Sequence, residues 1–300
     1  MSDVTITLPA FAKINLTLRV LGKRADGYHD LDTIFQTISL QDTIEISPLD
    51  QPHIILSCND RSLSVGEDNL VIRAARTLQD GRASSKGARI HLEKRIPVQA
   101  GLGGGSSDAA VTLIGLARLW DLSLAREDLV TIASQLGADV PLFLSGGTAR
   151  GTGSGDKLEL LADWSEKFLL IVKPNANVNT SDAYKALDER SLTTHNSKTI
   201  LSTSVAKRIF DRVDFASLTN DFEVVAFDLA PEIRRAKGAL LKAGANAALL
   251  AGSGSAVFGL FDSEDAQRRA IQAIELETGW RVFPCRTVGR SEYQAAIPLC

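Results

Sequence analysis

Apolar and polar residues alternate along the first part of the chain. This period of two predicts strands at residues 5–8, 14–20, 33–40 and 43–47, with a polar loop at 22–29. Residues 88–96 alternate in the same way, and Pro97 ends the pattern. Three short apolar runs, at 168–172, 247–251 and 256–261, are typical of buried strands.

A period near 3.6 replaces this alternation in other segments. It predicts helices at residues 69–78, 107–120, 126–136, 221–227 and 231–243, and Gly137 ends the third of them. The polar residues 190–198 are expected to form a surface loop. Because strands come in groups with helices between them, the pattern favours an α+β fold over a doubly wound sheet. The glycines at 146–155 suggest a boundary shortly afterwards, so we predict two domains, 1–160 and 161–300.

Charge and composition narrow the possible functions. The 300 residues include 33 Lys and Arg against 36 Asp and Glu, a net charge of −3 that argues against a nucleic-acid-binding protein. We expect no membrane association, because no apolar stretch is long enough to cross a bilayer. The first residues lack the features of a secretory leader, and the three cysteines are too scattered for a disulfide framework or a zinc site. We expect a cytoplasmic protein, and nothing in the sequence implies a protein partner.

The strongest chemical signal is a glycine-rich segment that leads into a helix. Glycine lets a backbone approach a ligand closely, and a helix N-terminus presents free N–H groups to an anion. The segment therefore predicts a nucleotide-phosphate site, although a flexible turn with a serine cap is the alternative. Neither a Walker A loop, which needs a lysine, nor a dinucleotide-binding fingerprint fits well. The candidate nucleotide-binding residues are Pro97, Val98, Gln99, Ala100, Gly101, Leu102, Gly103, Gly104, Gly105, Ser106 and Ser107.

This segment resembles the phosphate loop of the GHMP kinases, which include galactokinase, homoserine kinase and mevalonate kinase. Residues 9–16 (PAFAKINL) and 251–258 (AGSGSAVF) are similar to the first and last motifs of that family, in the same order. Further similarity is to the members of this family that act on a cytidyl-diphosphate substrate, and it is carried by residues 24–29, 67–70 and 136–143. The resemblance implies a two-domain fold with the active site in the cleft between the domains. It also implies ATP-dependent phosphorylation of the 2-hydroxyl of 4-diphosphocytidyl-2-C-methyl-D-erythritol, on the non-mevalonate route to isoprenoid precursors.

The resemblance assigns catalytic roles to Asp139 and Lys13. Asp139 would accept the proton of the substrate hydroxyl, and Lys13 would keep that carboxylate ionised and orient the hydroxyl. Each residue also has a structural interpretation. Asp139 precedes Val140 and Pro141 as a helix N-cap would, and Lys13 would suit an edge strand that faces water.

Further residues are assigned to ligands in the same way. Asn15, Tyr28 and His29 would contact the substrate, with His29 reading the cytosine edge, and Tyr184 is a candidate to stack on the base. Asn69 would lie near the adenine, although it also suits a helix N-cap.

Phosphoryl transfer normally requires Mg²⁺. Ser107 or Asp139 could contact the ion, but the sequence identifies no ligand set. Asp108, directly after the serine pair, is an unexpected charge beside a phosphate site, and we expect its side chain to point away from it.

Three other functions remain open at this point. The chain could be a GHMP kinase that acts on mevalonate, phosphomevalonate or homoserine, although residues 28 and 29 give no reason for a small carboxylate site. It could be a nucleotide-binding regulator without activity, but such a protein would lack Lys13 or Asp139. A dinucleotide-dependent oxidoreductase is disfavoured because Asp121, which has roughly the spacing of the acidic residue that binds the ribose, lies between two predicted helices and not at the end of a strand.

Overall fold

Two β-sheets form the framework of the protein, for which a computed structural model describes residues 4–164, 167–193 and 217–299. The first sheet has the order β3-β4-β2-β1-β8, and β5 pairs with both β2 and β6. Its strands are β1 (Ile6–Lys23), β2 (His29–Leu49), β3 (Ile54–Cys58), β4 (Gly87–Glu93), β5 (Thr148–Gly153), β6 (Lys157–Leu160) and β8 (Thr219–Asn220). The second sheet is antiparallel with the order β11-β7-β10-β9. It consists of β7 (Phe168–Lys173), β9 (Ala247–Leu250), β10 (Val257–Phe261) and β11 (Arg281–Arg286).

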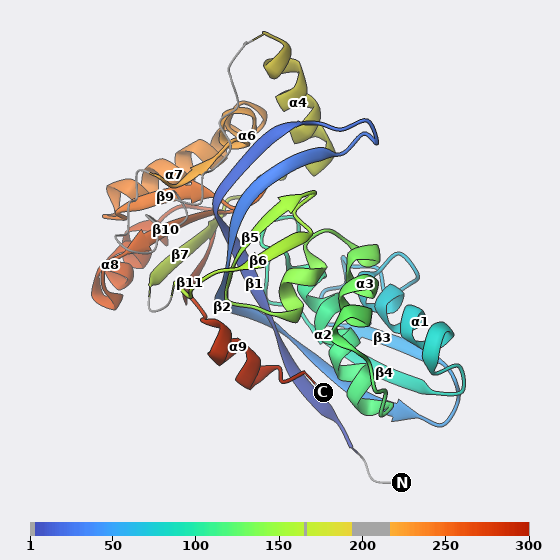
Figure 1. The fold of residues 1–300 in the computed structure, drawn as a ribbon. Coiled ribbons are helices and arrows are strands. Elements are labelled where there is room, and N and C mark those ends of the chain that lie inside the picture. The colour runs from blue at the N-terminus through green and yellow to red at the C-terminus, as the bar shows by residue number, and fades with distance from the viewer. Residues whose placement is uncertain (1–3, 165–166, 194–216, 300) are drawn as a thin grey trace.

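Helices cover one side of each sheet (Figure 1). The first sheet carries α1 (Leu70–Arg82), α2 (Gly104–Leu119), α3 (Arg126–Leu136) and the 3₁₀ helix η1 (Val140–Leu144). The second sheet carries α6 (Glu223–Leu229), α7 (Pro231–Lys242) and α8 (Glu264–Ile274). α4 (Thr180–Thr193) lies beside the tip of the β1–β2 hairpin, and α9 (Arg290–Ala296) is the last helix of the described residues.

Three hydrophobic cores hold these layers together. One lies between the first sheet and its helices, where Ile46, Leu78 and Leu113 are fully buried. A second core joins the two sheets, and Ile14 and Phe258 meet there. The third lies between the second sheet and α6, α7 and α8. The strands β1 and β2 therefore contribute to the cores of both halves of the molecule.

The four strands predicted in the first 50 residues are in fact two long strands, and this is a correction. Residues 6–8 and 14–20 belong to β1, which begins one residue after the predicted start, and residues 33–40 and 43–47 belong to β2. Register shifts interrupt their pairing between Phe11 and Ala12 and again beyond Asn15. A bulge shifts which residues face each side of the sheet. The alternation of apolar and polar residues is therefore interrupted, and the sequence of one continuous strand resembles that of two strands.

Most predicted helices are confirmed within a few residues at their ends, and residues 126–136 match α3 fully. The surface loop predicted at 190–198 is wrong for residues 190–193, which continue α4, while residues 194–198 lie outside the described residues. The sequence did not predict the helices α4, α8 and α9 or the strands β3, β5, β6, β8 and β11. The boundary near residue 160 stays a prediction. β8 lies in the second half of the chain, but it pairs with β1 and therefore belongs to the first sheet.

The helices of the described residues were also considered as membrane spans. None of them combines the length and the apolar character that crossing a bilayer requires.

Candidate active site

The glycine-rich segment joins β4 to α2 in a conformation that requires glycine at two positions. Gly101 and Gly103 have φ angles of +76° and +71°. A Cβ atom on Gly101 would lie 1.9 Å from the carbonyl oxygen of Ala251. A Cβ atom on Gly103 would lie 2.9 Å from the ring of Phe143 and 3.0 Å from Cγ of Lys13. The loop is therefore packed closely against neighbouring segments and is not a loose turn.

Backbone hydrogen bonds join the three motifs that lie far apart in sequence. The N–H of Lys13 on β1 donates to the carbonyl of Leu102 at 2.9 Å. The N–H of Ala256, in the last motif, donates to the carbonyl of Ala100 at 3.1 Å. The first and last motifs thus support the phosphate loop from its two sides.

Lys13 and Asp139 form an ion pair next to this loop. Nζ of Lys13 lies 3.4 Å from Oδ2 of Asp139 and donates a 2.8 Å hydrogen bond to Oδ1 of Asn15. The interpretation of Lys13 as a lysine that faces water is wrong, because it is 4% exposed on a strand with neighbours on both sides. Asp139 stands at the N-cap position of η1, yet its side chain makes no capping hydrogen bond. Its carboxylate is therefore not committed to the helix.

Two cavities meet at the phosphate loop. The larger has a volume of about 1000 Å³, and its lining includes Lys13 and Asp139. The smaller, of about 390 Å³, is lined by residues 97–106 of the predicted nucleotide site and by Asn69. Gly101, Gly103 and Ser106 line both cavities. A ligand in the smaller cavity would therefore reach the ion pair across the loop.

Two predicted nucleotide residues behave differently from the rest. Asn69 is the N-cap of α1, where its side chain accepts a 2.9 Å hydrogen bond from the N–H of Val71, and it also lines the smaller cavity. Both interpretations of Asn69 are thus compatible. Ser107 is fully buried and its hydroxyl has no hydrogen-bond partner among the described residues, so Ser106 is the serine that faces the cavities.

The predicted substrate residues line the larger cavity. Asn15 is buried and donates to Oγ1 of Thr33 at 2.7 Å, whereas Tyr28 is 67% exposed. The rings of His29 and Tyr184 stack directly on each other, with centroids 4.5 Å apart. A base therefore has no room between these two rings, and their roles stay predictions.

Sequence reasoning did not find several residues of this cavity. Oδ1 of Asp188 on α4 lies 2.7 Å from Nε2 of His29, and Oδ2 accepts a 3.0 Å hydrogen bond from Lys23. Burial by itself raises the pKa of Asp188, but the hydrogen bonds from His29 and Lys23 hold it below its ordinary value. Arg73 of α1 also lines the cavity. No local spacing links Asp188 with His29, because 159 residues separate them.

The described residues contain no group of three or more His, Cys, Asp or Glu side chains that could hold a metal ion by themselves. Mg²⁺ commonly binds through one or two carboxylates together with substrate phosphates and water. Asp139 and the hydroxyl of Ser106, which both face the larger cavity, fit that kind of site.

Comparisons with known proteins agree with this arrangement. Residues 69–147 match the model of the GHMP kinases N terminal domain, and residues 207–278 match that of the GHMP kinases C terminal. The chain is 44% identical to a 4-diphosphocytidyl-2-C-methyl-D-erythritol kinase of Solibacter usitatus, over 96% of the chain and 90% of that protein. It is 42% identical to the enzyme of the same name from Geobacter, over 94% and 99%.

Solved structures give the same result. A crystal structure of 4-(cytidine 5'-diphospho)-2C-methyl-D-erythritol kinase superposes with a TM-score of 0.81 at 35% identity, covering 95% of this chain and all of the other. A homoserine kinase from Cytophaga hutchinsonii superposes with a TM-score of 0.70 at 20% identity, over 97% of this chain and 96% of the other, which shows the shared fold alone. The α+β GHMP fold expected from the sequence is confirmed.

Proposed function

Because the chain belongs to the 4-diphosphocytidyl-2-C-methyl-D-erythritol kinases of the GHMP superfamily, we propose that it phosphorylates the 2-hydroxyl of that cytidyl substrate with ATP. The products are ADP and the 2-phosphate, an intermediate of the non-mevalonate route to isoprenoid precursors. The observation that carries this proposal is the meeting of two cavities at the phosphate loop, beside the Lys13–Asp139 pair.

The two cavities suit the two substrates of such a reaction. ATP would occupy the smaller one, with its phosphates at the N-terminus of α2, where free N–H groups and the helix dipole attract anions. The cytidyl substrate would occupy the larger one. Its hydroxyl would then approach the γ-phosphoryl group at Gly103 and Ser106, which line both cavities.

We assign the role of the base to Asp139. The substrate oxygen forms a bond to the γ-phosphorus, the bond from that phosphorus to the β,γ-bridging oxygen breaks, and ADP leaves with the electron pair. The hydroxyl proton passes to the carboxylate of Asp139, which faces the cavity. Lys13, fixed by Asn15 and by its backbone bond to the loop, holds that carboxylate in place.

Mg²⁺ is part of the proposal. The ion would neutralise charge on the β- and γ-phosphates while Asp139 and Ser106 offer protein oxygens on its side of the cavity.

Recognition of the cytidyl group is assigned to the tip of the β1–β2 hairpin and α4. Tyr28 presents an exposed ring, and His29 is held by Asp188 and Tyr184. Because both rings of the His29–Tyr184 stack are engaged with each other, we assign the stacking contact with cytosine to Tyr28 or to an outer face of that stack. The cytoplasmic location expected from the sequence stays a prediction.

The test is ADP release in the presence of Mg-ATP and one of four alcohols: the cytidyl-diphosphate substrate, methylerythritol phosphate, mevalonate or homoserine. Turnover with the first alone is the expected result. Turnover with mevalonate or homoserine instead would keep the Lys13–Asp139 chemistry and overturn the assignment of the larger cavity. ATP binding without turnover of any of the four alcohols would favour the alternative that the protein is a nucleotide-binding regulator without activity.

A further inference from the structure

The turn that follows η1 is shaped to receive α9. Gly146 and Gly147 in this turn have φ angles of +63° and +73°. A Cβ atom on Gly146 would lie 2.1 Å from the ring of Tyr293, and one on Gly147 would lie 2.8 Å from Cβ of Arg290. The two glycines therefore leave the space that side chains of α9 fill, which gives the start of the glycine-rich segment at 146–155 a structural reason.

Tyr293 fastens α9 to η1. Its side chain is buried, and the centroid of its ring lies 5.4 Å from that of Phe11. Its hydroxyl donates a 2.6 Å hydrogen bond to the carbonyl oxygen of Phe143. The last carbonyl groups of a helix have no partner within it, and Tyr293 supplies one here. Burial raises the pKa of the Tyr293 phenol, so the hydroxyl stays protonated and able to donate.

Phe143 carries this contact to both parts of the active site. Its ring lies against the phosphate loop, since a Cβ atom on Gly103 would come within 2.9 Å of it. Its backbone belongs to η1, which begins directly after Asp139. Because the side chain of Asp139 makes no capping hydrogen bond, the position of its carboxylate depends on where η1 lies. A support at the far end of this short helix therefore sets the proposed base relative to the loop.

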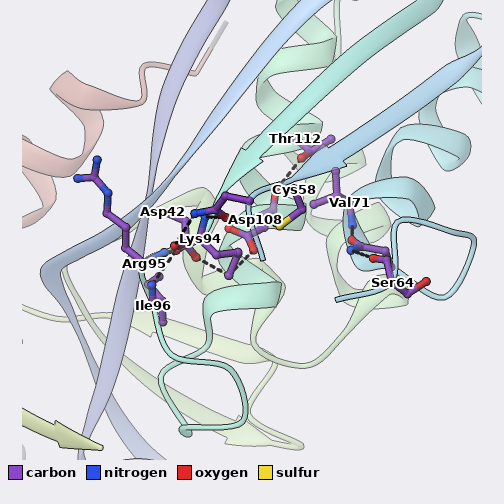
Figure 2. Close-up of polar contacts among 11 residues, drawn as sticks. Asp42, Cys58, Ser64, Val71, Lys94, Arg95, Ile96, Asp108 and Thr112 are labelled. Atoms are coloured by element: carbon purple, nitrogen blue, oxygen red, sulfur yellow. Dashed lines mark hydrogen bonds and ion pairs between the residues drawn. The ribbon is translucent and has the colours of Figure 1, made fainter. Parts of the chain in front are cut away.

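The two ends of the phosphate loop are fixed by a separate set of contacts. Nζ of Lys94, just before the loop, contacts Oδ2 of Asp42 on β2 and lies 2.7 Å from Oδ2 of Asp108 on α2 (Figure 2). Asp108, an unexpected charge beside a phosphate site, is thus paired with Lys94. Because these buried ion pairs do not involve Tyr293, the loop should still bind ATP when the Tyr293 hydroxyl is removed.

We propose that Tyr293 is a positioning residue of the kinase reaction, which holds η1 so that Asp139 meets the substrate hydroxyl in the geometry that proton transfer requires. The inference rests on the proposed function, since it requires Asp139 to act as the base. Tyr293 lines neither cavity, so it acts through Phe143 and η1. A misplacement of about 1 Å in a reacting group can cost about 10²-fold in rate, so a shift of η1 lowers kcat more than it weakens binding.

The test is Tyr293→Phe, which removes the hydroxyl and keeps the ring that packs against Gly146 and Phe11. We expect kcat to fall about tenfold, while the KM values for ATP and for the cytidyl substrate stay within about twofold. Trp280→Phe is the matched control, because it removes the 2.7 Å hydrogen bond from Nε1 of Trp280 to Oε1 of Glu232, in the second half of the chain. The control should keep the native kcat, and melting temperatures report how far each variant is destabilised.

A double-mutant cycle separates positioning from general destabilisation. If Tyr293 acts through Asp139, Tyr293→Phe should lower the rate in the native background and change it less than about twofold in the Asp139→Asn background. Single-turnover assays with enzyme in excess measure the slow rates of the Asp139→Asn variants. An equal loss in both backgrounds would show a structural role alone, and it would overturn the inference.

Two further outcomes are decisive. A native kcat in folded Tyr293→Phe would also overturn the inference, while turnover by the native protein would leave the proposed function intact. Absence of turnover by the native protein would remove the proposed function and this inference with it. If Tyr293→Phe fails to fold, Phe143→Leu takes its place in the cycle, because it withdraws the ring from Gly103 and keeps the carbonyl that Tyr293 binds. The same loss of rate, confined to the background that retains Asp139, is then expected, and an equal loss in both backgrounds would again overturn the inference.

Discussion

Lys13 is almost completely buried, while Asp139, whose Oδ2 atom lies 3.4 Å from Nζ of Lys13, is 31% exposed. The burial of the cation follows from the position of Lys13 between β2, where it pairs with Thr37, and the phosphate loop, where its N–H donates to Leu102. The exposure of the carboxylate follows from its place at the start of η1, where no capping bond holds it. A fixed cation beside an accessible carboxylate suits a base that must meet a substrate hydroxyl. A capping role would have required the reverse, a carboxylate committed to backbone N–H groups.

Replacing Asp139 with Asn tests the role of the base. The amide keeps the size of the side chain but cannot accept the hydroxyl proton, so kcat should fall by about 10²–10⁴-fold. The Kd for ADP measured without Mg²⁺ should stay within about threefold, since the carboxylate, which is also a proposed Mg²⁺ ligand, lies outside the smaller cavity. Asp265→Asn, on the exposed first turn of α8, serves as the control. Near-normal kcat in Asp139→Asn would remove the assignment.

Lys13→Met removes the cation and keeps most of the apolar stem. We expect a loss of kcat of at least about 100-fold, because the carboxylate of Asp139 and the amide of Asn15 both lose their partner. Lys23 is unsuitable as a control because it lines the same cavity and contacts Asp188. Exposed Lys242, at the end of α7, is the better comparison, and Lys242→Ala should keep full activity. Steady-state kinetics with both substrates distinguish the two variants, and equal activity would contradict the role of Lys13.

The phosphate loop was predictable from the sequence because its signal is local. Glycines at 101 and 103 are required by positive φ angles and close contacts, and the helix begins directly after them. The partnership of Lys13 with Asp139 was implied only by the resemblance, since a lysine in an apolar strand is otherwise read as an edge residue. The contact of Asp188 with His29 could not be predicted, because it depends on how α4 packs beside the β1–β2 hairpin.

The fold was predictable to a similar degree. The helices α3 and α7 were found because a single packed face sets their periodicity, but α8, whose amphipathic pattern is stronger, was not predicted. The long strand β1 was not found as one element, because residues 10–18 are buried on both sides and bulges interrupt its pairing. Between its two alternating runs, Ala10, Phe11 and Ala12 are all apolar and buried, so this part of the strand shows no alternation.

The requirement for glycine at position 103 is testable by a matched pair of substitutions. Gly103→Ala would place a Cβ atom against Phe143 and Lys13 at a φ angle of +71°. We expect a loss of about 1–3 kcal/mol in the free energy of unfolding and weaker Mg-ADP binding. Gly238→Ala in α7 meets nothing within 4 Å and should stabilise the protein by up to about 1 kcal/mol. Chemical denaturation measures the free energy of unfolding of both variants. Equal values for Gly103→Ala and Gly238→Ala would contradict the requirement for glycine at position 103.

Asp188→Ala tests how the cytidyl side of the larger cavity is organised. It leaves His29 and Lys23 without this carboxylate, so we expect the KM for the cytidyl substrate to rise about tenfold and the KM for ATP to stay within twofold. Glu189→Ala, exposed on the same helix, is the matched control and should change neither constant.

The effect of Asp188→Ala on the KM for the cytidyl substrate should depend on pH only under acidic conditions. Despite its burial, the pKa of Asp188 is held below its ordinary value by His29 and Lys23. The carboxylate therefore stays ionised through the neutral range, and its contribution disappears only as the pH falls through that lowered pKa. The ratio of KM values between Asp188→Ala and the native enzyme should accordingly be constant from pH 6 to pH 8. A ratio near one throughout this range would show that His29 is positioned by Tyr184 alone, without help from Asp188.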